Sequence, residues 1–295
     1  MPTATLPILD IGLALAVVAV WGSNFVVIRI GLDHLPPLLF AALRFSLAAV
    51  PGIFLAARPP VSWGNLAAYG LLIGSAQFGL LFTALRGHIS PGLASLVIQL
   101  QVFFTIGLSI AFTGERVRPF QWAALALAVA GIGVIALHTD ASTTPLGLGL
   151  VILASLGWAS GNIAAKRGGA PSMLPYVIWA SLISAPPLLM LSFLLEGWDA
   201  IHAGILQATA ATWGALVWQS VGNTLFGYAV WGWLLSRHPA AVITPMALLV
   251  PVFGMGASAL WFGEPLPAWK LGAAALVLSG LGLGILYPRW RPERI

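Results

Sequence analysis

The chain has 295 residues, of which 59% are hydrophobic and 7% charged, and its mean hydropathy is +0.97. Soluble domains carry roughly 25% charged residues, so 13 Lys+Arg and 8 Asp+Glu cannot cover a water-exposed surface of this size. The composition therefore predicts an integral membrane protein with no sizeable soluble domain. The net charge of +5 does not indicate a nucleic-acid partner, because the basic residues are scattered rather than clustered.

Cysteine is absent, which excludes disulfides, iron–sulfur clusters and thiolate metal sites. No metal ion and no cofactor are expected. The first apolar run is not a signal peptide, because residues 1–10 contain no Lys or Arg.

Apolar stretches separated by Pro, Gly and charged residues predict an all-α fold with ten transmembrane helices. Ser90 and Pro91 are typical of an N-cap and a first helical residue. The expected spans are 10–31, 37–57, 64–85, 91–112, 120–138, 146–165, 174–195, 212–235, 240–262 and 268–287.

The distribution of Lys and Arg predicts the orientation. If the N-terminus is cytoplasmic, nine basic residues fall inside and only Arg29, Arg86 and Lys270 fall outside, while Arg44 lies within a span. Both termini are therefore expected in the cytoplasm, and the protein in the inner (plasma) membrane. The nine inner residues are Arg58, Arg116, Arg118, Lys166, Arg167, Arg237, Arg289, Arg291 and Arg294.

The two halves of the chain resemble each other. A shift of 149 residues pairs Phe104 with Phe253, Gly107 with Gly256, Ser109 with Ser258, Gly114-Glu115 with Gly263-Glu264, and Gly131 with Gly280. Five spans per half is an odd number, so the second half must enter the membrane inverted, an architecture typical of secondary transporters. We expect a first repeat at 1–138, a linker at 139–145, a second repeat at 146–288 and a basic tail at 289–295.

Three segments carry a family resemblance: WGSNFVVIRIGL (Trp21–Leu32), PPLLFAALRFSLAA (Pro36–Ala49), and the Gly-Glu pairs that close the fourth and ninth spans. They resemble the EamA family of the drug/metabolite transporter superfamily. The resemblance implies export of small metabolites, and the similarity is to exporters of aromatic and other neutral amino acids. The second half has no counterpart of Leu43-Arg44-Phe45, since its matching helix reads YVIWASL (Tyr176–Leu182).

Polar residues inside spans are the candidates for a substrate site, because the membrane interior makes them costly. Arg44 either meets a substrate carboxylate or ties its helix to neighbouring carbonyls. The amides either line a cavity with Trp walls or join helices as polar contacts. The candidate set for the cavity is Trp21, Asn24, Arg44, Gln77, Gln99, Trp158, Asn162, Gln219, Asn223 and Trp231.

Prolines and carboxylates suggest further roles. Pro245 and Pro251 are expected to bend the ninth span, either for gating or for packing. Residues 123–137 and 271–286 carry almost nothing polar and are expected to be peripheral support helices. Glu115 and Glu264 precede the fifth and tenth spans, where a carboxylate favours a helix N-terminus. No carboxylate lies clearly within a span, so the hypothesis is alternating access either as a uniporter or with coupling through groups that the sequence does not identify.

Other functions of this fold remain as alternatives, including a multidrug or nucleoside exporter. An intramembrane protease would match the Gly-x-Ser pattern at Ser109 and Ser258, but the five histidines fall at helix ends or loops, away from any role as a base. A channel would need acidic rings that are not visible. The expected partners are a small-molecule substrate and the lipid bilayer, with no obligate protein partner.

Overall fold

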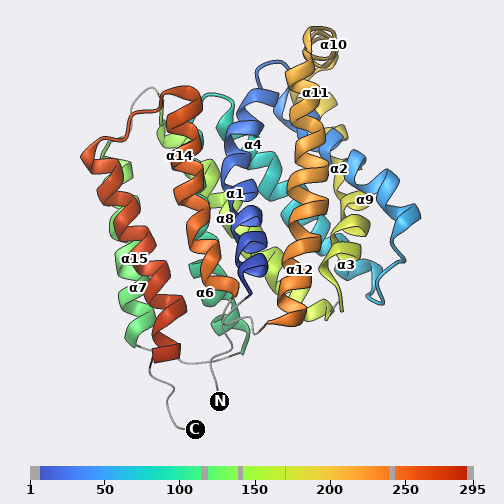
Figure 1. Ribbon diagram of the computed structural model, residues 1–295. Helices are drawn as coiled ribbons and strands as arrows, with labels where there is room; N and C mark the ends of the chain where they lie inside the picture. The colour runs from blue at the N-terminus through green and yellow to red at the C-terminus, as the bar shows by residue number, and fades with distance from the viewer. Residues whose placement is uncertain (1–6, 114–118, 139–141, 170, 239–242, 291–295) are drawn as a thin grey trace.

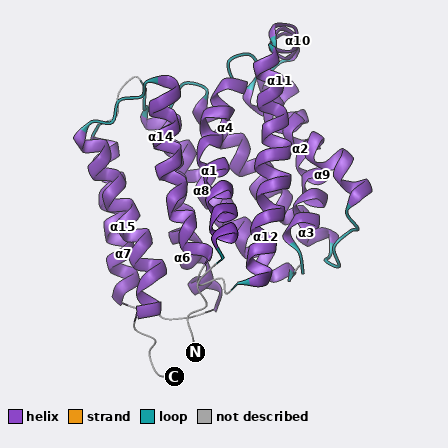
Figure 2. Cartoon of the chain, in the orientation of Figure 1, coloured by secondary structure: helices purple, strands orange, loops and turns teal. Residues whose placement is uncertain are grey.

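The computed structural model describes residues 7–113, 119–138, 142–169, 171–238 and 243–290, and every regular element in these ranges is a helix (Figures 1 and 2). No strand occurs in the described part of the chain. The long continuous helices are α1 (Ile8–Gly31), α2 (Pro37–Leu55), α7 (Pro119–Leu137), α8 (Pro145–Gly168) and α15 (Ala268–Trp290). The expected all-α membrane fold is therefore confirmed.

The remaining helices are built from shorter pieces that continue one another. In chain order they are α3 (Trp63–Tyr69), η1 (Gly70–Gln77) and α4 (Phe78–Leu85); α5 (Pro91–Val97), η2 (Ile98–Leu100) and α6 (Gln101–Thr113); α9 (Met173–Leu191) and η3 (Ser192–Glu196); α10 (Trp198–Gln207); α11 (Ala210–Val217), η4 (Trp218–Phe226) and α12 (Gly227–Arg237); η5 (Thr244–Leu249) and α14 (Val250–Phe262).

Among the described residues, eight helices are long and apolar enough to cross a membrane, and a ninth span results if the bent pair Trp198–Gln207 and Ala210–Arg237 is counted as one. Residues Ala268–Gly284 form a shorter apolar helix. The structure thus supports a multi-span membrane protein, while the count of ten and the inverted repeat stay predictions. The Gly114-Glu115 pair, and residues 139–141 of the linker expected at 139–145, lie outside the described residues.

Side-chain caps begin several helices where the sequence expects them. The hydroxyl of Ser90 accepts a hydrogen bond from the amide of Leu93, and Pro91 follows in the first turn of α5, as predicted. Thr144 caps α8 in the same way through the amide of Gly147, at 3.0 Å. These caps satisfy backbone donors that have no partner within the helix.

Helix α10 was not anticipated from the sequence, which left residues 196–211 as a connection. It turns by 103° from the axis of Ala210–Arg237 and lies across one end of the bundle (Figure 1). Trp198 and Leu206 on this helix are exposed. Apolar side chains at a bundle end suit the interface between membrane and water.

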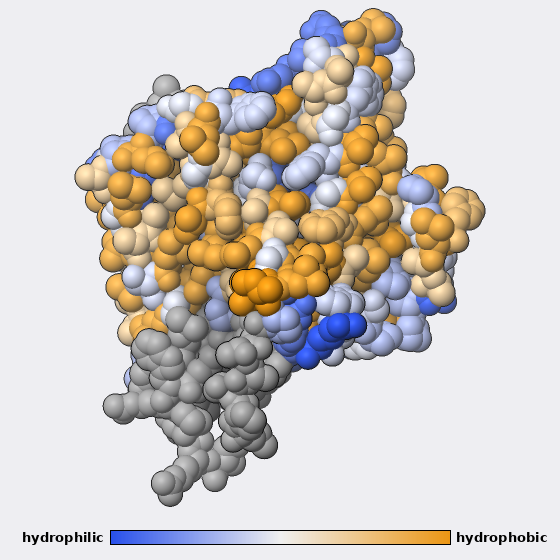
Figure 3. Space-filling view, viewed as in Figure 1, coloured by the Kyte–Doolittle hydropathy of each residue, from blue (hydrophilic) through white to orange (hydrophobic). Residues whose placement is uncertain are grey.

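The outer surface is apolar because its solvent is lipid rather than water. Figure 3 shows hydrophobic residues across most of the visible middle of the bundle. Phe54, Leu260 and Trp261 all point outward. Helices α7 and α15 pack against each other at one side of the bundle (Figure 1).

Candidate functional site

A cavity of about 530 Å³ lies inside the bundle and is lined by residues from both halves of the chain. This volume falls in the range of small-molecule sites. The cavity brings together eight of the ten candidate residues, which are Trp21, Asn24, Gln77, Gln99, Trp158, Asn162, Asn223 and Trp231. The cavity also reaches Leu281 of α15. This helix was expected to be peripheral, and the expectation is wrong at this position.

Irregular helical turns form much of the cavity wall. The π-helical segments η1 and η4 carry Gln77 and Asn223, and the 3-10 segments η2 and η5 carry Gln99 and Leu248. Such turns leave backbone groups outside the regular α-helical pattern and are frequent at functional sites. Sequence periodicity did not reveal them.

Amide side chains on the wall are joined into contacts between helices. Asn162 of α8 donates from Nδ2 to Oε1 of Gln101 at 3.0 Å and to Oγ1 of Thr105 at 3.3 Å. Gln99 donates to the carbonyl of Ala247 at 3.5 Å. Gln77 differs from these, because its Oε1 is buried and has no hydrogen-bond partner. Gln77 itself lines the cavity, whereas this oxygen atom is not exposed to it.

Gln219 does not line the cavity but supports a residue that does. It is fully buried, and its Nε2 donates to Oδ1 of Asn24 at 2.6 Å. The contact fixes the orientation of the Asn24 amide, whose residue belongs to the cavity wall. Both residues were predicted to line the cavity. Asn24 does so, whereas Gln219 lies behind it.

Aromatic rings form the apolar part of the wall. The rings of Trp21 and Trp231 lie 5.2 Å apart, and those of Trp21 and Tyr228 lie 5.9 Å apart. These separations are typical of favourable aromatic pairs. The sequence interpretation missed Tyr69, Tyr228, Phe78 and Gln101, which also line the cavity. Tyr69 lies eight residues before Gln77, which is about two helical turns, and this spacing is the signal in the sequence that could have pointed to it.

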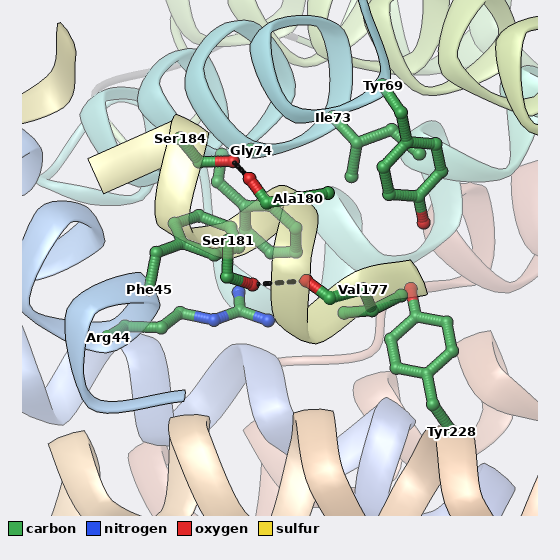
Figure 4. A pocket seen from close by; sticks show the side chains of 11 residues that line it. Arg44, Phe45, Tyr69, Ile73, Gly74, Val177, Ala180, Ser181, Ser184 and Tyr228 are labelled. Atoms are coloured by element: carbon green, nitrogen blue, oxygen red, sulfur yellow. Dashed lines mark hydrogen bonds between the residues drawn. The ribbon is translucent and has the colours of Figure 1, made fainter. Parts of the chain in front are cut away.

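Arg44 lies outside this cavity, in a small side pocket of about 10 Å³ (Figure 4). Its side chain is buried, with an exposed fraction of 2%. One guanidinium nitrogen, Nη2, donates to Oγ1 of Thr224 at 3.0 Å, and the guanidinium carbon lies 3.8 Å from the centre of the Phe78 ring. Among the described residues, no carboxylate forms an ion pair with Arg44.

The two prolines proposed as kinks lie at the starts of helical segments rather than inside one continuous helix. Pro245 is the second residue of the 3-10 segment η5, and Pro251 is the second residue of α14. A proline costs least there, because the first residues of a helix have no intrahelical partner for their amides. The break between the two segments faces the cavity through Ala247, Leu248 and Val250.

The described carboxylates that are buried lie at helix ends. Asp10 accepts from His238 at 2.6 Å, and Glu196 accepts from the amides of Leu38 and Leu39. Glu264 accepts from the amide of Gly92 at 3.2 Å, so it serves the N-terminus of α5 as well as preceding α15. Neither pocket is lined by Asp, Glu or His. Within the described ranges, no cluster of three such side chains could hold a metal ion.

A family model described as the EamA-like transporter family matches residues 9–137 and again residues 145–286. The chain belongs to this family. It is 41% identical to a "Probable amino-acid metabolite efflux pump" of Salmonella typhimurium, over 92% of this chain and 93% of that protein. A protein of the same description from Escherichia coli is 40% identical over 95% of each chain.

A solved crystal structure has the same fold, with a TM-score of 0.66 over 95% of this chain and 98% of the other. At 19% identity, this similarity concerns the fold alone. The chain is therefore a membrane transporter of the EamA-like family with several membrane spans, as its sequence motifs implied.

Proposed function

We propose that this EamA-like chain exports small metabolites across the inner membrane, with neutral or aromatic amino acids as its substrates. The observation that carries the proposal is the cavity of about 530 Å³, with amides from both halves of the chain and Trp and Tyr walls. Amides supply hydrogen bonds to a zwitterion, and aromatic rings accept its apolar side chain. The two relatives described as amino-acid metabolite efflux pumps support this substrate class.

The mechanism we propose is alternating access between two inverted repeats of five helices, at 1–138 and 146–288. The family model matches twice, once in each range. A shift of 148 residues carries η1 (Gly70–Gln77) onto the first eight residues of η4 (Trp218–Phe226), and carries η2 (Ile98–Leu100) into η5 (Thr244–Leu249). Irregular segments at matching positions beside a shared cavity are typical of transporters with repeats.

The packing of the helices supports the same proposal. Helix α1 packs against α14, and its counterpart α8 packs against α6. Helix α2 packs against α9, and α7 against α15, so that corresponding helices of the two ranges are neighbours. An exchange of the two halves converts the α1–α14 pair into the α8–α6 pair. It maps the α2–α9 and α7–α15 pairs onto themselves, as a two-fold relation requires.

The cavity extends toward the end of the bundle where α1 begins. Met173, the first residue of α9, and Leu235, near the end of α12, both line it. At the opposite end, His34 bonds Thr212 at 2.9 Å, and Glu196 accepts from the start of α2. With both termini in the cytoplasm, this arrangement corresponds to a cavity directed inward and closed on the outside.

Transport as a uniporter, driven by the substrate gradient alone, follows from the side chains available. The walls of both pockets lack Asp, Glu and His among their described residues, so no group there exchanges a proton near neutral pH. No enzymatic step is proposed, because the same walls hold no nucleophile paired with a base.

Counterflow in liposomes tests the function. Purified protein is reconstituted, and uptake of labelled Phe, Met and Thr is compared with a sugar, a nucleoside and a cationic drug, with and without a proton gradient. We expect amino-acid exchange that is independent of the gradient. Exchange of the drug or nucleoside alone would refute the substrate class, and accumulation driven by the gradient would refute the uniporter.

A further inference from the structure

Arg44 is a buried cation whose hydrogen bonds are incomplete. Its Nε and Nη1 atoms are inaccessible and have no hydrogen-bond partner, and only Nη2 is bonded, to Thr224. An unpaired charge in a low-dielectric interior is expensive, and arginines inside membrane proteins normally pair or face a polar cavity. The guanidinium therefore retains capacity for a ligand that accepts hydrogen bonds.

The side pocket around Arg44 lies next to the large cavity and shares part of its wall. Tyr69, Phe78 and Tyr228 line both spaces. Figure 4 shows the guanidinium of Arg44 reaching into the pocket, and the hydroxyls of Tyr69 and Tyr228 directed toward each other at its far side. A volume of about 10 Å³ corresponds to one water-sized group, so no more than one oxygen atom of a larger molecule fits there.

The remaining polar groups of the pocket do not neutralise the arginine. Ser181 donates its hydroxyl to the carbonyl of Val177 at 2.7 Å, and Ser184 donates to the carbonyls of Gly70 and Ala180. The two tyrosines add further hydroxyl groups. The pocket thus presents one positive charge and neutral hydroxyls, which selects for an anionic head group, and the planar guanidinium suits a carboxylate best.

We propose that the side pocket binds the carboxylate of the transported amino acid, while the apolar side chain of that substrate lies in the large cavity. The inference rests on the proposed function and adds the substrate orientation to it. Recognition of the carboxylate excludes amides and amines of the same shape.

The test compares exchange of L-phenylalanine and L-phenylalaninamide in liposomes, for the wild type, Arg44→Gln and Arg44→Lys. We expect the wild type to prefer the acid in KM by roughly 10- to 100-fold, the range for a hydrogen bond to a charged group. Arg44→Gln should bring this ratio close to one by raising KM for the acid. Arg44→Lys, which keeps the charge without the planar fork, should fall between the two.

Arg86→Gln is the matched control, because Arg86 is exposed at the end of α4 and remote from both pockets. It should keep the preference of the wild type. Thermal unfolding of the wild-type protein with each compound needs no variant, and only the acid should stabilise it. Equal stabilisation by acid and amide would overturn the inference even if both Arg44 variants fail to fold.

The outcomes separate the two proposals. If the wild type exchanges no amino acid, the proposed function fails. If it exchanges acid and amide equally, or if Arg44→Gln weakens both to the same extent, only the carboxylate site fails. Replacing chloride in the buffer tests the other source of a small anion, and an equal change in KM for acid and amide would assign the pocket to the inorganic ion.

Discussion

The indole N–H of Trp21 donates a hydrogen bond of 3.2 Å to the main-chain carbonyl of Asn223, 202 residues away in sequence. Asn223 lies in the π-helical segment η4, and both residues line the large cavity. The contact joins α1 of the first half to η4 of the second. It also holds the Trp21 ring beside Tyr228 and Trp231, so one bond orients a whole aromatic wall.

Gly227, at the start of α12, makes this contact possible. A Cβ at Gly227 would collide with the Trp21 indole at Nε1 and Cε2. We expect Gly227→Ala to displace the ring, to cost about 1–3 kcal/mol as an overpacked interface, and to reduce counterflow. Trp21→Phe keeps an aromatic ring but loses both the hydrogen bond, worth about 0.5–1.5 kcal/mol, and part of the ring surface, so it should reduce counterflow as well. Normal exchange by Gly227→Ala would show that the ring does not belong to the transport site.

The close packing of α1 against α14 predicts an effect on stability. A Cβ at Gly22 would lie 2.5 Å from Cβ of Phe253 and 2.6 Å from the carbonyl oxygen of Val250. Because backbone cannot move aside cheaply, Gly22→Ala should lower the thermal unfolding temperature of the purified protein. Gly12→Ala in the same helix has nothing within 4 Å and should leave that temperature unchanged or raised. Equal effects of the two variants would contradict this packing.

Composition and hydropathy were sufficient for the fold class, because a lipid solvent imposes long apolar helices whatever their packing. Intramembrane polarity likewise identified Asn24, Asn162 and Asn223 as residues of the cavity wall. The same rule could not distinguish Asn24, which lines the cavity, from Gln219, which donates a hydrogen bond to Asn24 and does not line the cavity, because both are buried amides. Only the rotation of each helix distinguishes them, and packing between helices sets that rotation.

Irregular helices and aromatic partners escaped the sequence for a related reason. The π-helical turns of η1 and η4 have no compositional signature, and a 3.6-residue period does not detect them. Tyr69 and Tyr228 resemble ordinary membrane-helix residues until η1 and η4 direct them toward one cavity. The side pocket of Arg44 is formed by four separate helical stretches, α2, α3–η1–α4, α9 and α12, and is a property of tertiary structure.

The contact of Asn162 with Gln101 and Thr105 predicts a change in substrate affinity. Asn162 donates to both partners from α8 to α6, and Asn162 and Gln101 line the cavity. Asn162→Ala leaves the Oε1 of Gln101 without its donor, so we expect KM for L-phenylalanine to rise several-fold, with normal insertion into the membrane. Ser236→Ala near the exposed end of α12 is the control. Unchanged KM in Asn162→Ala would remove this amide from the substrate site.

The orientation of the chain is open to a clean labelling experiment, because the sequence contains no cysteine. Ala57, after α2, and Ala203, in α10, are both exposed and lie toward opposite ends of the bundle. With both termini in the cytoplasm, Ala203→Cys should react in intact cells with a membrane-impermeant maleimide. Ala57→Cys should react only after the membrane is opened. The reverse pattern would refute the orientation predicted from the Lys and Arg distribution.

Glu264, in the connection between α14 and α15, joins three helices at the end of the bundle opposite the start of α1. It accepts from Ser90 at 2.5 Å, from the amide of Gly92, from Lys270 at 2.7 Å and from Ser258. Burial on its own raises the pKa of Glu264, but the hydrogen bonds from Lys270, Ser258 and Ser90 outweigh burial and hold that pKa below its ordinary value of 4.5. The folded state therefore favours the ionised carboxylate.

A group whose pKa is lowered by folding stabilises the protein above its unfolded pKa and loses this contribution as the pH falls through the folded value. The contribution of Glu264 to the unfolding temperature should therefore be constant between pH 7 and 5. At pH values below about 4.5 the unfolding temperature of the wild type should decrease as this contribution is lost. The Glu264→Gln variant should not show this decrease. Lys270→Met leaves a buried charge unpaired and should cost about 3–5 kcal/mol. The double variant should recover much of this loss, because it removes both charges. If the two single effects simply add, Glu264 and Lys270 do not act as a pair.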